Sequence, residues 1–155
     1  MTVRVLRYSV GNEHDPGDPW GRSELVIDQD GTARLEHHFS RVQAVGAWTG
    51  RVETAALEAL WAGLERAGFP SAPATPLTPG ASARKLVVET DGEIEQAYIG
   101  YHRASALSGY AEAFDILDAI IRQLSADAIT YPTNQPAIVR DATETRDGPD
   151  GGPAR

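Results

Sequence analysis

Three consecutive side chains, Glu36, His37 and His38, are those in this sequence best suited to acid–base or metal chemistry. They fall in an expected strand, where neighbouring side chains point to opposite faces, so the two histidines cannot bind one ion together. Glu36 and His38 share a face, but a metal site needs three or four ligands. We therefore expect no metal ion and treat Glu36 and His38 as part of a binding surface.

His37 is expected to point inward, with Tyr98 and Gln96 at matching inward positions in the second half of the chain. An imidazole exchanges protons near neutral pH and can serve as a general base, while a phenol and an amide can orient a substrate. The three side chains could therefore line a small polar pocket with His37 as the base. Alternatively, each polar tip reaches the rim of the core and finds a partner there.

Several loop residues are further candidates for binding. The segment Glu13–Asp18 gathers carboxylates and a histidine, but its spacing is not that of a calcium-binding loop. Trp20 and Trp48 can either cover a sheet edge or anchor a partner protein. His102 and Arg103 follow the last expected strand of the second hairpin. They could hold an anion where the next helix begins, or be solvated charges beside a helix cap.

The composition narrows the classes of function. The 155 residues suit one domain, and the absence of cysteine removes disulfides, thiolate metal sites and cysteine nucleophiles. The net charge of −8 disfavours binding to nucleic acid and suits a basic protein or a cationic small molecule. Because no phosphate-binding loop, dinucleotide fingerprint or hydrolase motif occurs, a binding role is favoured over an enzyme and no cofactor is expected.

The sequence also bears on location and source. No apolar run is long enough to span a membrane, and the first ten residues, which include Arg4 and Arg7, lack the apolar core of a secretion signal. We expect a cytoplasmic location and no membrane partner. The preference for arginine over lysine, together with abundant alanine, is typical of a high-GC bacterial genome.

The elements that must position these residues are separated by glycine, proline and Asp-Gly turns. Strands are expected at Thr2–Val10, Glu24–Asp28, Ala33–Phe39, Lys85–Glu89 and Glu93–Tyr101, and helices at Glu53–Ala67 and Tyr110–Leu124. A loop covers residues 11–22, a second loop ends at Thr49-Gly50, and a proline-rich arm covers 69–83. We expect one domain over residues 1–130 and a flexible polar tail over 131–155.

The two halves of the domain, about 23–68 and 84–126, match each other. Leu25–Gly31 aligns without gaps on Leu86–Gly92, and the apolar positions of the two expected helices then align in phase. We infer an α+β fold with a ββα-ββα internal pseudo-repeat. Two helices would pack on one face of an antiparallel sheet of four to five strands, and the first strand would join an edge of that sheet.

The pairing within each hairpin decides which side chains face the helices. A three-residue loop that ends at Gly31 puts Leu25 opposite Leu35 on the inner face. The same loop in the second hairpin puts Leu86 opposite Gln96. The face without helices then carries the polar side chains Glu24, Arg34, Glu36, His38, Glu89, Glu93, Glu95 and Tyr101.

The stretch Asp30–Pro70 has an Asp-Gly turn, a GAWTGRV segment before the helix and a helix that ends in AGFP. In these features it resembles small bacterial domains of unknown function. The resemblance covers about residues 20–125 and implies the same order of hairpin and helix in each half. It implies no functional residue.

Three functions remain open at this point. The first is a non-catalytic binding or accessory module that presents an acidic sheet face, including Glu36, Glu89, Glu93 and Glu95, to a basic protein or a cationic small molecule. The second is a dimerising structural domain, a homodimer paired across a twofold axis through Val26, Val87, Ala97 and Ile99. The third is a small enzyme in which His37 is the general base and Tyr98 or Gln96 orients the substrate.

Overall fold

Seven β-strands, two α-helices and one short 3-10 helix form the part of the chain that the computed structural model describes, residues 3–11, 21–39, 44–73, 83–101 and 103–145. The strands are β1 (Arg4–Gly11), β2 (Arg22–Ile27), β3 (Thr32–Phe39), β4 (Ala44–Val52), β5 (Ala83–Thr90), β6 (Glu93–Gly100) and β7 (Val139–Thr145). The helices are α1 (Thr54–Ala67), η1 (Arg103–Ala106) and α2 (Tyr110–Leu124).

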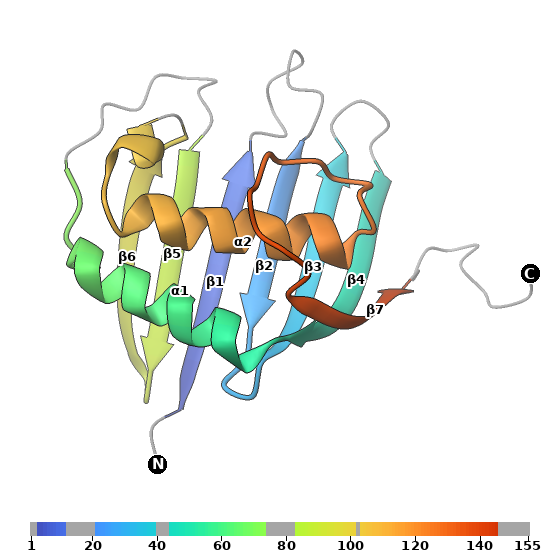
Figure 1. Cartoon of the computed structure of the whole chain (residues 1–155), viewed down its shortest axis with the longest axis horizontal. Helices are drawn as coiled ribbons and strands as arrows, with labels where there is room; N and C mark the ends of the chain where they lie inside the picture. Colours follow the sequence, from blue (N-terminus) through green and yellow to red (C-terminus); the bar gives the residue numbers. More distant parts are fainter. Residues whose placement is uncertain (1–2, 12–20, 40–43, 74–82, 102, 146–155) are drawn as a thin grey trace, which may run out of the picture.

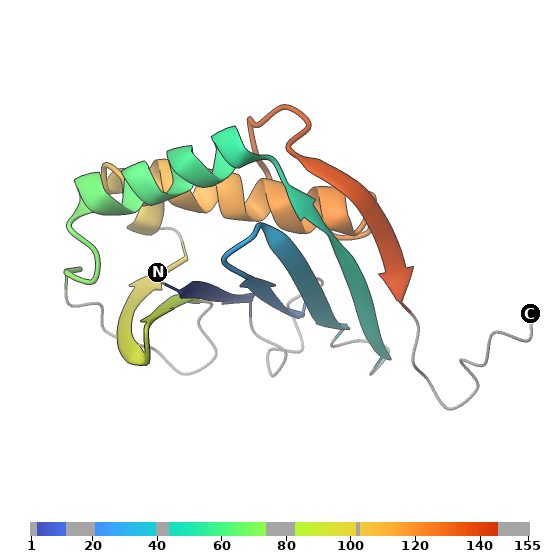
Figure 2. The ribbon, with the colours of Figure 1, turned by 90° about the horizontal axis from the view of Figure 1, so that it is seen from below.

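The strands form one antiparallel sheet in the order β6-β5-β1-β2-β3-β4-β7. Both α-helices cross the sheet (Figure 1) and lie on the same side of it (Figure 2). The predicted α+β class, with an antiparallel sheet and two helices, is therefore confirmed, but the sheet has seven strands instead of four to five. β1 lies inside the sheet, between β5 and β2, rather than at an edge, and its alternate side chains Leu6, Tyr8 and Val10 are buried.

The core lies between the helices and the inner face of the sheet. The helix residues buried there are Leu60 and Leu64 of α1 and Phe114, Leu117 and Ile121 of α2. The regularly spaced apolar residues that predict the two helices are therefore the ones that pack against the sheet. Among the described residues, none of the helices is long and apolar enough to cross a membrane.

The first hairpin has the predicted three-residue loop. Leu25 pairs with Leu35 and Ile27 pairs with Ala33, so these four side chains lie on the inner face. The Asp28 amide donates to the Thr32 carbonyl at 2.8 Å, and Gly31 has a φ of 92°. A glycine is favoured there because a side chain is strained at that φ value.

The second hairpin does not have the loop predicted for it. Thr90 pairs with Glu93, so the turn contains only Asp91 and Gly92, whose φ values of 50° and 90° are those of a type I′ turn. The pairing is shifted, and Leu86 lies opposite Ala97 instead of Gln96. Every side chain of β6 therefore faces the other side from the one expected.

Strand β4 falls where the sequence predicts a loop. The sequence of β4 does not indicate a strand, because it contains two glycines and glycine is typical of loops and bulges. At Gly50 a Cβ atom would lie 2.7 Å from the Leu124 side chain of α2, so the glycine allows the helix to approach the strand closely. Trp48, expected in that loop, is a strand residue whose side chain is 7 % exposed.

The predicted flexible tail is wrong for residues 131–145, which belong to the fold. Tyr131 is fully buried, Ile138 is buried, and β7 pairs with β4 at an edge of the sheet. The amide of Ile138 donates to the Gln123 side chain at 2.7 Å. The composition of this segment is polar because β7 lies at an edge of the sheet and most of its side chains are exposed. It therefore lacks the apolar pattern by which a strand is recognised in a sequence.

The predicted ββα-ββα repeat is not confirmed. In the first half a third strand, β4, separates the hairpin β2–β3 from α1, whereas in the second half η1 separates the hairpin β5–β6 from α2. The two hairpins also differ in their turns, and they lie on either side of β1 in the sheet. The sequence similarity of Leu25–Gly31 to Leu86–Gly92 therefore reflects two Asp-Gly hairpins whose strands pair in different registers.

Candidate functional site

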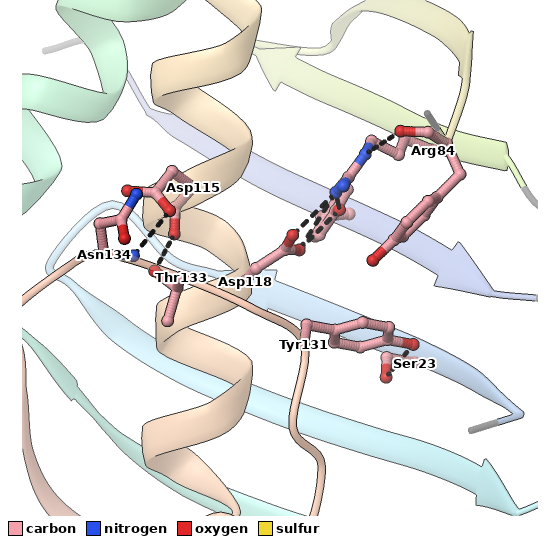
Figure 3. Close-up of polar contacts among 9 residues, drawn as sticks. Ser23, Arg84, Asp115, Asp118, Tyr131, Thr133 and Asn134 are labelled. Carbon is pink, nitrogen blue, oxygen red and sulfur yellow. Dashed lines mark hydrogen bonds and ion pairs between the residues drawn. The ribbon is translucent and has the colours of Figure 1, made fainter. Parts of the chain in front are cut away.

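A buried ion pair joins the sheet to α2 (Figure 3). The Arg84 guanidinium of β5 donates to both carboxylate oxygens of Asp118, at 3.0 and 3.2 Å. The Tyr8 hydroxyl donates to the same carboxylate at 2.9 Å and also contacts Arg84. The guanidinium lies 4.2 Å from the centre of the Tyr101 ring. These buried polar groups therefore act as hydrogen-bonding partners for one another in the core.

Burial dominates the protonation equilibria of this cluster. It raises the pKa of the Tyr8 hydroxyl well above 10, and the neighbouring Asp118 carboxylate raises it further. Burial also raises the pKa of Asp118, although the Arg84 guanidinium opposes that rise. Because all three side chains are closed off from solvent, we interpret the cluster as a structural link between β1, β5 and α2.

His37 lies on the inner face, as predicted, and is fully buried. Its Nδ1 atom is 2.6 Å from the Ser23 hydroxyl, which is itself 3.3 Å from the Tyr131 hydroxyl. Tyr98 and Gln96 lie on the opposite face, because the second hairpin has a two-residue turn. The three proposed catalytic residues therefore do not line one pocket, and a catalytic role for His37 stays a prediction without a shared site to support it.

The helix-free face carries charges of both signs. Glu24, Glu36 and Glu89 lie on it, interspersed with the basic side chains Arg7, Arg22, Arg34 and Lys85. Glu93 and Glu95, expected on this face, lie on the helix side because of the pairing of β6. Ala97 and Ile99, proposed for pairing two outer faces, are buried on the inner face.

His38 also lies on the helix-free face, with its Nε2 atom 3.8 Å from Glu36 and 3.9 Å from Glu24. Arg22 forms an ion pair with Glu24 at 2.8 Å. The described residues contain no group of three or more side chains that could hold a metal ion. Glu36 and His38 therefore belong to a surface of mixed charge.

The anion site predicted at His102 and Arg103 stays a prediction, and the start of the next helix already holds one of the protein's own carboxylates. The Glu112 side chain accepts a hydrogen bond from the Gly109 amide at the start of α2, at 2.5 Å. Arg103 is exposed on η1. The other predicted loop candidates, Trp20, His102 and the Glu13–Asp18 segment, lie outside the described residues.

A groove of about 450 Å³ opens between α1 and the strands β5 and β6. Trp61, Glu65 and Phe69 line it from the helix side, Glu95 lines it from β6, and Arg4 lies at one end. Both aromatic rings pack partly against the core, and both carboxylates are exposed. We call this the α1–β6 groove; its remaining lining residues are Ala62, Leu64, Val88 and Thr90.

The α1–β6 groove already holds a cationic group. The guanidinium of Arg4 lies over the Trp61 ring, 3.8 Å from its centre. A smaller hollow of about 180 Å³ lies on the other side of this stack, and Asp28 and Glu58 contribute to its lining. Aromatic faces attract cations because of their quadrupole, and carboxylates nearby add to the attraction. The arrangement is suited to binding guanidinium or ammonium groups.

Only part of this groove could have been found in the sequence. In the sequence Trp61 falls at the apolar spacing of the expected helix, and nothing in the local pattern distinguishes Glu65 one turn later. A two-residue Asp91-Gly92 turn would have placed Glu95 on the helix side. The position of Arg4 beside Trp61 depends on tertiary packing between β1 and α1.

Comparisons with known proteins add no family. A scan against protein-family models, a search of curated proteins and a search of solved structures each found no match to this chain. The functional assignment therefore rests on the chemistry of the described residues.

Proposed function

We propose that this protein is a non-catalytic binding module whose α1–β6 groove receives a basic side chain of a partner protein. The observation that carries the proposal is the stacking of Arg4 on Trp61, at 3.8 Å, in a groove that also contains Glu65 and Glu95. The chain thus binds one of its own guanidinium groups in the way that an external one would be bound.

The charge around the groove favours a basic partner. Glu65 and Glu95 line the groove itself, and Glu58 lies in the adjoining hollow together with Asp28, which pairs with Arg34 at 3.6 Å. Arg4 is the basic residue among the described residues that line these two spaces. The whole chain carries a net charge of −8, which attracts a basic partner over a distance and speeds its association. The proposal keeps the acidic binding module inferred from the sequence and moves its surface from the helix-free face to the helix side.

Binding of a hexa-arginine peptide tests the proposal. Fluorescence anisotropy of the labelled peptide measures its Kd for the full chain, and a hexa-citrulline peptide of the same shape without charge is the first control. Glu95→Gln and Glu65→Gln are each expected to raise the Kd about 1.4- to 5-fold, because an exposed charge pair contributes about 0.2–1 kcal/mol. Added salt should weaken the binding.

Glu36→Gln is the matched control variant. It removes the same charge from an exposed strand residue, but on the helix-free face. The proposal expects it to change the Kd far less than Glu95→Gln does. If Glu36→Gln weakens binding as much as Glu95→Gln, or if the citrulline peptide binds equally well, the α1–β6 groove is not the binding site. Competition by free arginine amide separates recognition of a small cation from recognition of a peptide.

A further inference from the structure

The two edges of the sheet are built differently. At the β7 edge the pairing with β4 is interrupted by a bulge near Thr49 and Arg51, and Asp141 has a φ of 57°. Bulges and irregular backbone discourage pairing with another chain. At the other edge β6 pairs without interruption over eight residues, and it contains no proline or lysine. Among the described residues no strand pairs with the outer side of β6, which therefore presents a regular free edge.

The turn of the second hairpin shows which backbone groups of β6 are free for a further strand. Thr90 and Glu93 flank a two-residue turn, so they exchange hydrogen bonds, and so do the alternate pairs after them. The intervening residues Ile94, Gln96 and Tyr98 direct their amides and carbonyls away from β5. These three residues form the free edge.

The side chains along this edge are unusually apolar for exposed positions. Ile94 is 64 % exposed and Tyr98 is 47 % exposed. Both lie on the helix-free face, one on each side of Gln96. The edge is thus symmetric about Gln96 in both its hydrogen-bonding groups and its exposed apolar side chains.

We propose that β6 pairs antiparallel with β6 of a second copy of this chain, with Gln96 opposite Gln96 on the twofold axis. In this register Ile94 faces Tyr98 twice, and about six backbone hydrogen bonds form between the copies. Glu95 faces Ala97 and Glu93 faces Ile99, so no two carboxylates stand directly opposite each other. The sheet becomes continuous across the two copies.

The neighbouring registers are less favourable. A shift in one direction places Glu95 opposite Glu95, and like charges directly opposite are destabilising. A shift in the other direction places Ile94 opposite Gly100 and Tyr98 opposite Gln96, which removes both pairs of apolar side chains. The carboxylates of β6 therefore select the register. Because each copy carries a net charge of −8, dimerisation should strengthen with added salt, the opposite of the response expected for a basic peptide.

Sedimentation equilibrium of the full chain, with three exposed-residue variants, tests the pairing. The natural chain should form a dimer whose Kd falls as salt is added. Ile94→Glu should raise the dimer Kd about tenfold or more, because two apolar pairs are lost and two carboxylates are placed in the interface. Adding Tyr98→Lys to Ile94→Glu should restore dimerisation, since the new charges face each other in this register. Tyr98→Lys alone should weaken it.

A crosslinking experiment can identify the register of the pairing. Because the natural chain contains no cysteine, a single introduced cysteine can form a disulfide only with its copy in the other chain. Gln96→Cys places two thiols in directly opposed positions, about 5.5 Å apart between Cα atoms, which a disulfide can bridge. Val45→Cys is the control, since Val45 is 58 % exposed and lies on β4. Mild oxidation should link Gln96→Cys chains much faster than Val45→Cys chains. A monomer at millimolar concentration, a dimer insensitive to Ile94→Glu, or equal crosslinking of both variants would overturn the proposal.

Discussion

The guanidinium of Arg4 lies 3.8 Å from the centre of the Trp61 ring, and this contact joins the start of β1 to the exposed side of α1. The backbone amide of Arg4 is held by the Gln29 side chain at 2.7 Å, so both ends of the residue are positioned by neighbouring elements. Arg4 lies at the boundary between the α1–β6 groove and the smaller hollow beside Glu58. It therefore competes with any external cation for the face of Trp61.

The first prediction concerns this competition. Arg4→Met should lower the Kd for the hexa-arginine peptide about 2- to 5-fold, because the ring face of Trp61 becomes available and a repelling charge is removed. Anisotropy titrations at one salt concentration measure the change. Arg7→Met is the matched control, since it removes the same charge from an exposed residue of β1 on the helix-free face. Equal effects of the two variants would indicate a nonspecific effect of net charge.

The second prediction concerns the buried ion pair. Asp118→Asn should lower the free energy of unfolding by about 3–5 kcal/mol, because the Arg84 guanidinium then lies in the core without an opposite charge. Urea unfolding followed by circular dichroism measures the loss. The double variant Arg84→Met, Asp118→Leu should lose less than Asp118→Asn alone, since it leaves no buried charge unpaired. A larger loss in the double variant would contradict this account.

The third prediction concerns stability in alkali. The pKa of Tyr8 is raised by burial, so above pH 10 the unfolded chain releases this proton while the folded chain retains it. Stability is therefore fully present below pH 10 and is lost as the pH rises, by about 1.4 kcal/mol per pH unit for each such group. Burial raises the pKa of Tyr110 in the same direction.

Urea unfolding at a series of pH values from 8 to 12 tests the alkaline prediction. In Tyr8→Phe the loss of stability above pH 10 should be shallower than in the natural chain. The variant should also be less stable at pH 8 by about 1–3 kcal/mol, because Asp118 and Arg84 lose a hydrogen-bonding partner. An unchanged slope above pH 10 would show that Tyr8 does not contribute to the pH dependence.

The fourth prediction concerns residues 131–145. Ending the chain after Thr130 removes the buried side chains of Tyr131 and Ile138 together with β7. Burial of each such side chain contributes about 1.5–3 kcal/mol, so the shortened chain should lose most of its stability. Ending the chain after Thr145 retains all of these contacts and is the control. Thermal unfolding of both chains measures the difference, and equal melting temperatures would contradict the role assigned to this segment.

The way in which residues 133–135 are held explains why the sequence does not predict that residues 131–145 belong to the fold. The Asp115 carboxylate of α2 accepts hydrogen bonds from the Asn134 amide at 3.0 Å and the Gln135 side chain at 2.8 Å. The Thr133 hydroxyl donates to the Asp115 carbonyl at 3.0 Å (Figure 3). Polar composition predicts a flexible segment, but side-chain hydrogen bonds to a helix can order such a segment without an apolar pattern.

Local patterns in the sequence determined both α-helices, the first hairpin and the inward position of His37. The helices follow from apolar spacing and the glycine that ends α1, because these features act within a few residues. The first hairpin follows from matching apolar faces on two adjacent strands. In each case the deciding interactions connect residues that are near one another in the chain.

Tertiary structure alone decided the rest, including the candidate site. The position of β1 between β5 and β2, the edge position of β7 and the approach of Arg4 to Trp61 depend on contacts between segments distant in the chain. Strand β4 is stabilised by neighbouring strands on both sides despite its glycines. In β6, a shift of one residue in the pairing with β5 moves Glu95 to the helix side of the sheet. Local preferences differ by too little to settle such choices, so the energy of packing across the whole sheet settles them.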